Sequence, residues 1–186
     1  MPELTTRPLD ESTWDAFAKL VEANNGVWGG CWCVGFHPKE EGPSNREKKL
    51  CRVREGRTHS SLVFEGEDCV GWCQFGSPDE LPRIKHGRAY REGLTKLPDW
   101  RITCFYVGKG HRGKKVAITA LRGALEQIGL LGGGFVESYP EDVTGRKISS
   151  SFLYNGTLDM FVREGFEKTR RLNSNHWVVT KVVGGR

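Results

Sequence analysis

Residues 101–128 read RITCFYVGKGHRGKKVAITALRGALEQI. The first part, Arg101 to Val107, is rich in β-branched and aromatic side chains, which predicts a strand. The last part, 114–128, carries apolar residues at helical spacing, which predicts the strongest amphipathic helix of the chain. A basic, glycine-rich segment joins the two. This strand, loop and helix unit predicts an α/β fold.

The loop between the strand and the helix has the layout of an anion-binding site. A helix N-terminus offers unpaired backbone N–H groups and the positive end of the helix dipole, and glycines let a phosphate approach the backbone closely. Lys109, Arg112, Lys114 and Lys115 add positive charge. Spacing alone leaves two interpretations open, namely a phosphate-binding loop and a solvated basic turn.

The segments before this unit predict two helices, a long loop and a hairpin. Residues 12–25 have helical periodicity, 26–42 are irregular and rich in Gly, Trp and Cys, and 45–56 read as a charged, exposed helix. Residues 60–64 and 69–75 are strand-like on either side of Glu65-Gly66-Glu67-Asp68, which suits a hairpin. The long connection 77–100 has no clean period apart from a possible short helix, and connections of that length are usually functional.

The segments after the unit alternate strands with one helix. Residues 135–139, 166–171 and 176–183 have strand character, and 155–164 has helical character. The whole chain of 186 residues fits one compact domain, 1–186, with a single sizeable core.

Composition favours a globular protein in a reducing compartment. Apolar residues make up 37% and charged residues 27% of the chain, and no apolar run is long enough to span a membrane. The amino terminus lacks the pattern of a secretory signal, so we expect a cytoplasmic protein with its 6 cysteines as thiols. The 28 basic and 23 acidic residues are interleaved, so we expect neither a nucleic-acid partner nor a membrane partner.

Two motifs resemble signatures of the GNAT superfamily of N-acetyltransferases. His111-Arg112-Gly113-Lys114-Lys115-Val116-Ala117 is similar to the family's acetyl-CoA pyrophosphate loop, in which Arg or Gln is followed by two residues, Gly, one residue and Gly or Ala; Arg112 and Ala117 match. Asn155, followed ten residues later by Gly165-Phe166, resembles the second signature. The two motifs occur in the family's order, and the resemblance covers 60–183.

The resemblance implies a fold, a co-substrate and a binding site. The fold is α/β, with a mixed, mostly antiparallel, twisted sheet of six to seven strands, including a first strand near 4–8, and helices on both faces. The activity is direct transfer of an acetyl group from acetyl-CoA to a primary amine, without a metal. The residues that the resemblance assigns to the coenzyme are Phe105, Tyr106, Val107, His111, Arg112, Gly113, Lys114, Lys115, Val116, Ala117, Asn155 and Phe161.

Two positions depart from the family pattern. Lys115 stands where the family usually has glycine, so its side chain has to point away from the phosphates or onto them. Phe161 stands where many members carry the tyrosine that protonates the departing thiolate. These departures support a rival hypothesis, in which the protein binds coenzyme A or a derivative without catalysis.

The proton acceptor predicted for the amine is Glu137. Strand alternation places it on one face with Phe135 and Tyr139, beside the strand that the resemblance assigns to the coenzyme. The alternative is a surface carboxylate near a sheet end. The resemblance implies that a backbone N–H near Tyr106 or Val107 meets the oxyanion, and Tyr139 or Tyr154 is a candidate acid.

The irregular loop allows several interpretations. Cys31, Cys33 and His37 have metal-like spacing, but a closed zinc site needs a fourth ligand, so buried thiols are preferred over a metal or nucleic-acid module. Trp28, Trp32 and Phe36 either pack onto the core or line a substrate site. Two further expectations are that Cys69 and Cys73 share one buried strand face, and that the basic cluster at 83–91 is a solvated face or grips an acidic group.

The acceptor itself is not specified by any motif. A small-molecule amine is preferred over a protein lysine or amino terminus, because the long connection and the Trp-rich loop can close over a compact ligand. A homodimer is possible.

Overall fold

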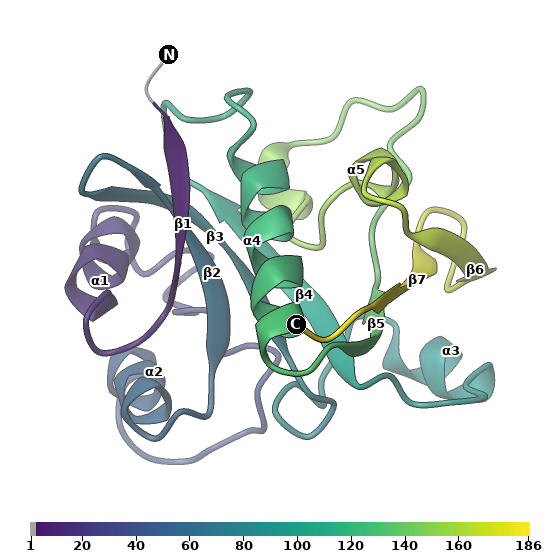
Figure 1. The fold of residues 1–186 in the computed structure, drawn as a ribbon, viewed down its shortest axis with the longest axis horizontal. Helices are drawn as coiled ribbons and strands as arrows, with labels where there is room; N and C mark the ends of the chain where they lie inside the picture. Colours follow the sequence, from purple (N-terminus) through teal and green to yellow (C-terminus); the bar gives the residue numbers. More distant parts are fainter. Residues whose placement is uncertain (1–2) are drawn as a thin grey trace.

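The structure is a computed structural model that describes residues 3–186, apart from the side chain of Ser151. It contains a seven-stranded sheet in the order β1-β2-β3-β4-β5-β7-β6, as Figure 1 shows. Neighbouring strands are antiparallel except for the parallel pair β4 and β5. The strands are β1 Leu4–Pro8, β2 His59–Glu65, β3 Asp68–Gly76, β4 Trp100–Val107, β5 Gly134–Ser138, β6 Glu167–Arg171 and β7 Trp177–Val183. The predicted mixed sheet is confirmed.

Helices cover both faces of the sheet. In Figure 1, α4 crosses the sheet on the viewer's side, and α1 and α2 lie behind it. The helices are α1 Trp14–Glu22, α2 Asn45–Arg54, α3 Gly87–Glu92, α4 Val116–Leu130 and α5 Leu158–Arg163, with a short 3-10 helix η1 at Ser150–Phe152. Within the described residues, none of these helices has the length and apolarity needed to cross a bilayer.

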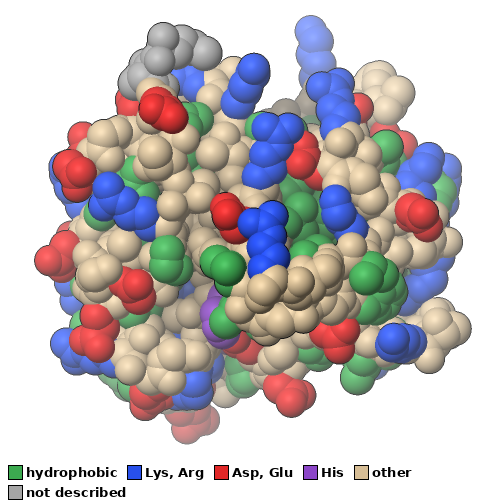
Figure 2. All heavy atoms as spheres, viewed as in Figure 1, with side chains coloured by type: hydrophobic (Ala, Val, Ile, Leu, Met, Phe, Trp, Pro, Cys, Tyr) green, Lys and Arg blue, Asp and Glu red, His purple; other side chains and the backbone are tan. Residues whose placement is uncertain are grey.

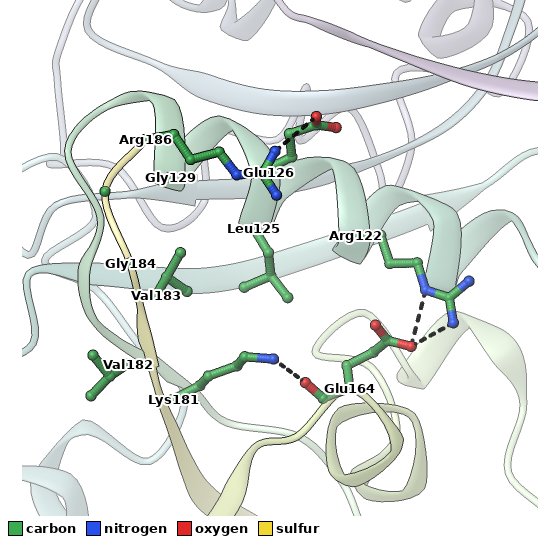
Figure 3. Close-up of a pocket in the computed structure, with 11 residues that line it drawn as sticks. Arg122, Leu125, Glu126, Gly129, Glu164, Lys181, Val182, Val183, Gly184 and Arg186 are labelled. Carbon is green, nitrogen blue, oxygen red and sulfur yellow. Dashed lines mark hydrogen bonds and ion pairs between the residues drawn. The ribbon is translucent and has the colours of Figure 1, made fainter.

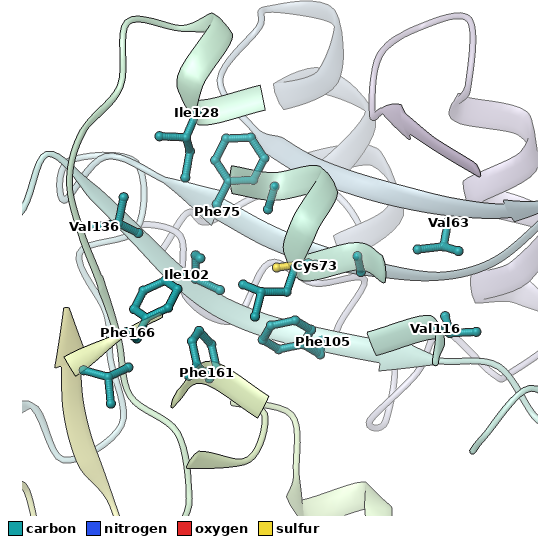
Figure 4. Close-up of a cluster of buried hydrophobic side chains, with 14 of the residues drawn as sticks. Val63, Cys73, Phe75, Ile102, Phe105, Val116, Ile128, Val136, Phe161 and Phe166 are labelled. Atoms are coloured by element: carbon teal, nitrogen blue, oxygen red, sulfur yellow. The ribbon is translucent and has the colours of Figure 1, made fainter. Parts of the chain in front are cut away.

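Two hydrophobic clusters hold the layers together. The cluster drawn in Figure 4 packs α4 and α5 onto one sheet face through Leu121, Ile102 and Phe161, all fully buried. The second cluster packs α1 and the Trp-rich loop onto the other face through Phe17 and Trp72. Each such buried side chain contributes about 1.5–3 kcal/mol relative to exposure. The sheet is therefore fixed from both sides.

A bulge in β4 divides the sheet. Phe75 of β3 lies opposite Ile102, whereas the next residue back, Gln74, lies opposite Cys104, so Thr103 is the extra residue on β4. Only the stretch from Trp100 to Ile102 of β4 pairs with β5. Beyond the bulge the edge of β4 faces a different segment, 153–157. The sheet is thus split at its parallel pair.

Gly71 of β3 sets how closely the first turn of α4 approaches the sheet. A Cβ atom at Gly71 would lie 2.6 Å from the carbonyl oxygen of Tyr106 and 2.6 Å from Cγ1 of Val116. No side chain fits at these distances, so the start of α4 rests directly on the backbone of β3 and β4. This contact places the N-terminus of α4 at the end of β4.

Two predictions about helices need correction. The helix predicted at 155–164 begins only at Leu158, because Thr157 caps it and Gly156 adopts a left-handed φ of 76°. The helix predicted as exposed, α2, buries Lys49 (0% exposed) and Arg52 (3% exposed) against the loop that precedes it. The spacing of charged residues along the sequence does not indicate which of them are buried.

Cys69 and Cys73 were predicted on one strand face, and they lie on opposite faces. Both are buried, Cys69 in the cluster under α1 and Cys73 in the cluster under α4. The register of β2 and β3 shifts between Val63 and Phe64, where one extra residue of β3 is accommodated. The extra residue of a bulge moves every later side chain of the strand to the other face. Residues four apart therefore lie on opposite faces when a bulge separates them.

Candidate functional site

The N-terminus of α4 is open and basic. Lys115 occupies the cap position without a side-chain hydrogen bond, so no described side chain caps the N–H groups of the first turn. Residues 112–115 are exposed, and Arg112, Lys114 and Lys115 place their charges around this end of the helix. Figure 2 shows Lys and Arg side chains gathered on this face toward the upper end of α4. The geometry is that of an anion site.

Two residues of the loop adopt left-handed backbone conformations. Gly113 has φ 77°, which glycine adopts without steric cost. Lys115 has φ 63° and ψ 12°, a conformation that a residue with a Cβ adopts at a cost of about 1–2 kcal/mol. This explains why glycine suits position 115 in the family pattern. The exposed Lys115 side chain points away from the core.

Contacts on either side anchor the base of the loop. The backbone N–H of Gly108 donates to the carbonyl oxygen of Val70 at 2.9 Å, and His111 Nε2 lies 3.2 Å from Glu65 Oε2. These contacts tie the loop to the hairpin of β2 and β3. The middle of the loop remains available to a ligand.

The edge of β4 lies next to this loop and meets residues 154 and 155. The N–H of Phe105 donates to the carbonyl oxygen of Tyr154 at 2.7 Å, and Asn155 Nδ2 donates to the carbonyl oxygen of Thr103 at 2.8 Å. Asn155 Oδ1 is buried and has no hydrogen-bond partner in the structure. Strand alternation points the N–H of Val107 to the same edge as that of Phe105, and that of Tyr106 to β3.

Phe161 lies in the core and not at this edge. It is fully buried, and its ring packs against Phe105 at 5.9 Å and Phe166 at 5.0 Å between ring centroids (Figure 4). A direct contact of the Phe161 side chain with the coenzyme, as the resemblance implied, would therefore require the ring to leave the core. Val116 likewise buries its side chain and offers only its backbone N–H to a ligand, whereas Ala117 is half-buried.

Glu137 lies in a closed polar cluster on the sheet face opposite α4. Its Oε2 accepts hydrogen bonds from Tyr90 at 2.7 Å and from Tyr139 at 3.1 Å, and it is 4% exposed. Burial raises the pKa of Glu137, although the two tyrosine hydroxyls and the Arg101 charge oppose the shift. The alternative interpretation as a surface carboxylate is wrong. Tyr139 is buried too, and burial raises its pKa well above the usual value.

Tyr90 of α3 was not among the sequence candidates, and it closes the cluster. The guanidinium groups of Arg101 and Arg170 each lie 5.2 Å from the centre of its ring. Arg170 also donates to the carbonyl oxygen of Tyr90 at 2.7 Å. The partners come from β4, α3 and β6, far apart in the sequence, and no local pattern could indicate that they meet.

The irregular loop is packed onto the core. Trp32 stacks on Trp14 with 6.0 Å between ring centroids, and His37 Nδ1 lies 3.0 Å from the carbonyl oxygen of Glu80. His37 Nε2 lies 3.2 Å from Thr58 Oγ1 and 3.1 Å from Gln74 Nε2. Both ring nitrogens of His37 thus face protein groups. In the described part of the chain, no three His, Cys, Asp or Glu side chains form a metal-binding group.

Lys49 is the ammonium group buried beneath this loop. Its Nζ donates to Thr58 Oγ1 at 2.8 Å and to the carbonyl oxygen of Cys33 at 3.5 Å. Burial lowers the pKa of Lys49, and the Cys33 thiol acts in the opposite direction. Despite its burial, Cys33 has a pKa lowered to about 7 by its hydrogen bond with Cys104 and by the Lys49 charge. Loop, α2 and β4 therefore share one polar cluster.

An open groove of about 630 Å³ runs between α4, β7 and the C-terminal tail. Figure 3 shows the charged side chains of this groove already in contact with one another. Arg122 pairs with Glu164 at 2.8 Å, Arg186 with Glu126 at 3.4 Å, and Lys181 donates to the carbonyl oxygen of Glu164. None of the predicted site residues lines the groove. Its charged side chains are already paired with protein groups, so they offer no free charge to a ligand.

The comparisons with known proteins agree with this fold. An acetyltransferase described as "histone acetyltransferase HPA2 and related acetyltransferase" from Corynebacterium glutamicum is 15% identical, with a TM-score of 0.57 and coverage of 100% of this chain and 99% of its own. A PaiA N-acetyltransferase from Thermoplasma acidophilum, solved in complex with coenzyme A, is 13% identical, with a TM-score of 0.54 and coverage of 97% and 99%. A GNAT-family acetyltransferase from Bacillus cereus is 11% identical, with a TM-score of 0.54 and coverage of 97% of each chain.

No protein-family model and no curated protein sequence matches the chain. The structural likeness extends over essentially the whole chain despite the low identity. The protein therefore has the fold of the GNAT acetyltransferases, which confirms the fold that the resemblance implied.

Proposed function

We propose that this protein transfers an acetyl group from acetyl-CoA to a primary amine. The observation that carries the proposal is the uncapped, basic N-terminus of the 15-residue helix α4, which lies directly at the end of a strand whose edge is split from its parallel neighbour. A pyrophosphate suits the helix end, and an extended thioester arm suits a strand edge.

The residues present fit coenzyme A. Coenzyme A has a pyrophosphate, which Gly113, Lys114 and the first-turn N–H groups would hold, and an arm that carries amide groups. The buried, unpartnered Oδ1 of Asn155 is an acceptor that such an amide N–H would satisfy. Bound acetyl-CoA supplies the thioester carbon that the amine attacks.

The amine has to be neutral when it attacks. A lysine-like amine with a pKa of about 10.4 is neutral in about one molecule in 2,500 at pH 7, so a positioned proton acceptor lowers the barrier. Glu137 is the proposed acceptor, and Tyr139 is the proposed companion that orients it through the 3.1 Å hydrogen bond. A carboxylate with a raised pKa is a stronger base than an exposed one.

Access to Glu137 requires motion of α3. Tyr90 covers the carboxylate and is itself 2% exposed, so an amine reaches Glu137 only when the Tyr90 ring moves or when water carries the proton. The helix α3 has six residues and belongs to the long connection, which makes it the movable part. The proposed base is thus gated by Tyr90.

The remaining steps need few groups. The amine nitrogen forms a bond to the acetyl carbon, the N–H of Val107 donates to the developing oxyanion, and the carbon–sulfur bond breaks. Because Glu137 pairs with Arg101, six residues before Val107 on β4, the proton of the amine passes to Glu137 through water. The coenzyme leaves as a thiolate with a pKa of about 8.5 and takes up a proton, so a dedicated acid is of limited value. Tyr154, half-buried at the edge of β4, is the better placed of the two tyrosines considered as acid, because Tyr139 already donates to Glu137.

A second candidate function is coenzyme binding without catalysis. Its support is the closed state of the polar cluster, in which Glu137 serves to hold Tyr90, and the core position of Phe161. In that case acetyl-CoA binds, and no amine is acetylated at a rate above the uncatalysed one.

The test of the proposal is binding followed by turnover. Acetyl-CoA at a hundredfold excess over its dissociation constant should stabilise the fold by about 2.7 kcal/mol, measured as a rise in melting temperature. Release of free coenzyme A in the presence of an amine panel then measures transfer. Absence of a melting shift in folded, coenzyme-free protein contradicts the whole proposal. Binding without turnover favours the second candidate.

A further inference from the structure

Four aromatic side chains meet beside the end of β4, and we call them the aromatic wall. They are Trp28, Phe36, Tyr106 and Tyr154. Tyr154 lies 5.9 Å from Trp28 and 6.1 Å from Phe36, and Trp28 lies 5.5 Å from Tyr106, between ring centroids. All four are partly accessible, and Trp28 is 37% exposed. Three separate segments of the chain thus present flat apolar surface at one place.

The aromatic wall adjoins the proposed path of the coenzyme. Tyr106 immediately precedes Val107, and the carbonyl oxygen of Tyr154 accepts from Phe105 on the edge of β4 at 2.7 Å. Burial raises the pKa of Tyr106, and the Arg112 charge of the phosphate loop opposes that shift. A small molecule that rests on the wall therefore lies next to the edge along which the thioester arm would run.

An unpaired cation stands over the aromatic wall. Lys85 Nζ lies 5.3 Å from the centre of the Tyr154 ring, and among the described residues it has no ion-pair partner. The N–H of Arg83 donates to the carbonyl oxygen of Phe36 at 3.2 Å, which fixes this basic segment against the wall. A lysine held over a ring and free of a carboxylate can receive an anionic group.

The neighbouring titratable groups do not cancel this charge. Glu141 is engaged by Arg146 at 3.0 Å and lies 3.7 Å from His176. Burial lowers the pKa of His176 to about 4, and it lowers the pKa of His86 as well, so both imidazoles are neutral at pH 7. The surroundings of the wall are therefore positive through Lys85.

We propose that the acceptor is a small amine that carries both a flat apolar or aromatic group and a carboxylate. The flat group stacks on the aromatic wall, and the carboxylate pairs with Lys85. This inference rests on the acetyl transfer proposed above, and the bonds made and broken are the same. Acceptors with a second positive charge, such as polyamines or lysine-rich peptides, meet the like charge of Lys85.

The experiment compares acceptors that differ by one group. Phenylalanine has both features, phenethylamine lacks the carboxylate, and alanine lacks the ring; spermidine and a lysyl peptide represent the cationic class. Transfer from acetyl-CoA is followed by release of free coenzyme A. We expect kcat/KM for phenylalanine to exceed that for phenethylamine and for alanine by about tenfold or more, the usual worth of a charge-assisted hydrogen bond or a stacked ring.

Lys85→Gln tests the assigned cation. It should raise KM for phenylalanine about tenfold, change kcat by less than about twofold, and leave phenethylamine unaffected. Lys96→Gln is the matched control, because Lys96 lies at a similar 5.4 Å over the ring of Phe135, away from the wall. The control should leave all the acceptors unchanged.

The outcomes separate this inference from the proposed function. If acetyl-CoA does not bind, the proposed function fails and this inference fails with it. If acetyl-CoA binds and phenethylamine, spermidine or the peptide is the best acceptor, only the acceptor class is overturned. If it binds without turnover, binding of phenylalanine to the coenzyme A complex is measured by tryptophan fluorescence, with Trp28→Phe to assign the signal. Binding that is absent, or unaffected by Lys85→Gln, overturns the inference.

Discussion

His37 is held neutral by its surroundings, and its protonation is coupled to folding. Burial lowers its pKa to about 2, and the charges of Lys49 and Arg52 act in the same direction. In the unfolded chain a histidine titrates near 6.5. Stability from His37 is therefore fully present above pH 6.5 and is lost as the pH falls toward 2, at about 1.4 kcal/mol per pH unit.

This predicts that His37→Gln makes the protein less sensitive to acid. Between pH 6.5 and 5.0 the wild type should lose about 2 kcal/mol through His37, in addition to the loss through other groups. The variant starts less stable and should lack that part of the loss. Urea unfolding at both pH values measures the difference. His111→Gln, at a half-buried histidine of the loop, is the control, and equal acid losses in the wild type and His37→Gln would contradict the account.

The left-handed residues of the phosphate loop predict an order of effects on coenzyme binding. Gly113→Val forces a β-branched residue to φ 77° and should weaken acetyl-CoA binding by about tenfold or more. Arg112→Ala removes an exposed charge and should cost about fivefold or less. Lys115→Gly relieves the strained backbone and should change stability by less than about 1 kcal/mol. Calorimetric titration gives the two dissociation constants, and urea unfolding gives the stability of Lys115→Gly. A larger loss of affinity for Arg112→Ala would show that side-chain charge holds the phosphates.

At the level of elements, periodicity correctly predicted those helices and strands whose formation depends on the local sequence. The strand, loop and helix at 101–128 and the hairpin around Gly66 are present, because their signals lie within the segments themselves. The first strand near 4–8, which only the resemblance implied, is present as β1. The start of α5 was displaced by three residues, because Gly156 and Thr157 delay the helix. Bulges at Val70 and Thr103 changed which side chains share a face, since one added residue inverts the alternation.

The contacts of α3 lead to a prediction about the polar cluster. Glu137→Gln should lower turnover by about two to four orders of magnitude if Glu137 accepts the amine proton, with a deficit that narrows as the pH approaches the pKa of the amine. Tyr90→Phe keeps the carboxylate and removes one hydroxyl, so it should cost about 1.5–3 kcal/mol of stability while retaining turnover within about threefold. Equal turnover in wild type and Glu137→Gln under chemistry-limited conditions would exclude Glu137 as the base.

The ionisation of Glu137 also has a stability signature. Its pKa in the folded protein is raised, so the stability it contributes is present below the unfolded pKa of about 4.3 and is lost as the pH rises through the folded value. In Glu137→Gln that loss should be absent. Urea unfolding across this pH range compares the two proteins, and this signature arises whether the carboxylate is catalytic or only holds α3.

At the level of the whole molecule, the resemblance and the periodicity together predicted the sheet, but not how its halves are joined. The strands β4 and β5 pair over only three positions, Trp100 to Ile102 with Val136 to Ser138. Beyond them the segment 153–157 lies between the halves. It bonds β4 through Tyr154 and Asn155, and the chain after β5 through the N–H of Glu141, which donates to Gly156 at 3.1 Å. The sequence of any single segment does not indicate these long-range contacts.

Asn155 is therefore expected to serve both the fold and the coenzyme. Its Nδ2 joins the two halves at Thr103, and its unpartnered Oδ1 is the acceptor proposed for the coenzyme arm. Asn155→Ala should destabilise the fold by about 1–3 kcal/mol, because the carbonyl oxygen of Thr103 loses its donor, and should weaken acetyl-CoA binding about tenfold. Binding has to be measured well below the melting temperature of the variant, so that unfolding does not enter the constant.

The control for Asn155 is Asn173→Ala. Asn173 Oδ1 accepts from the N–H groups of Asn175 at 2.8 Å and His176 at 2.7 Å, on the turn before β7, so its loss should also destabilise the fold. Among the described residues Asn173 makes no hydrogen bond with β4, so coenzyme affinity should stay at the wild-type value. If both variants lose affinity in proportion to stability, binding follows the integrity of the whole fold. If only Asn155→Ala loses it, the split edge of β4 is where the coenzyme arm lies.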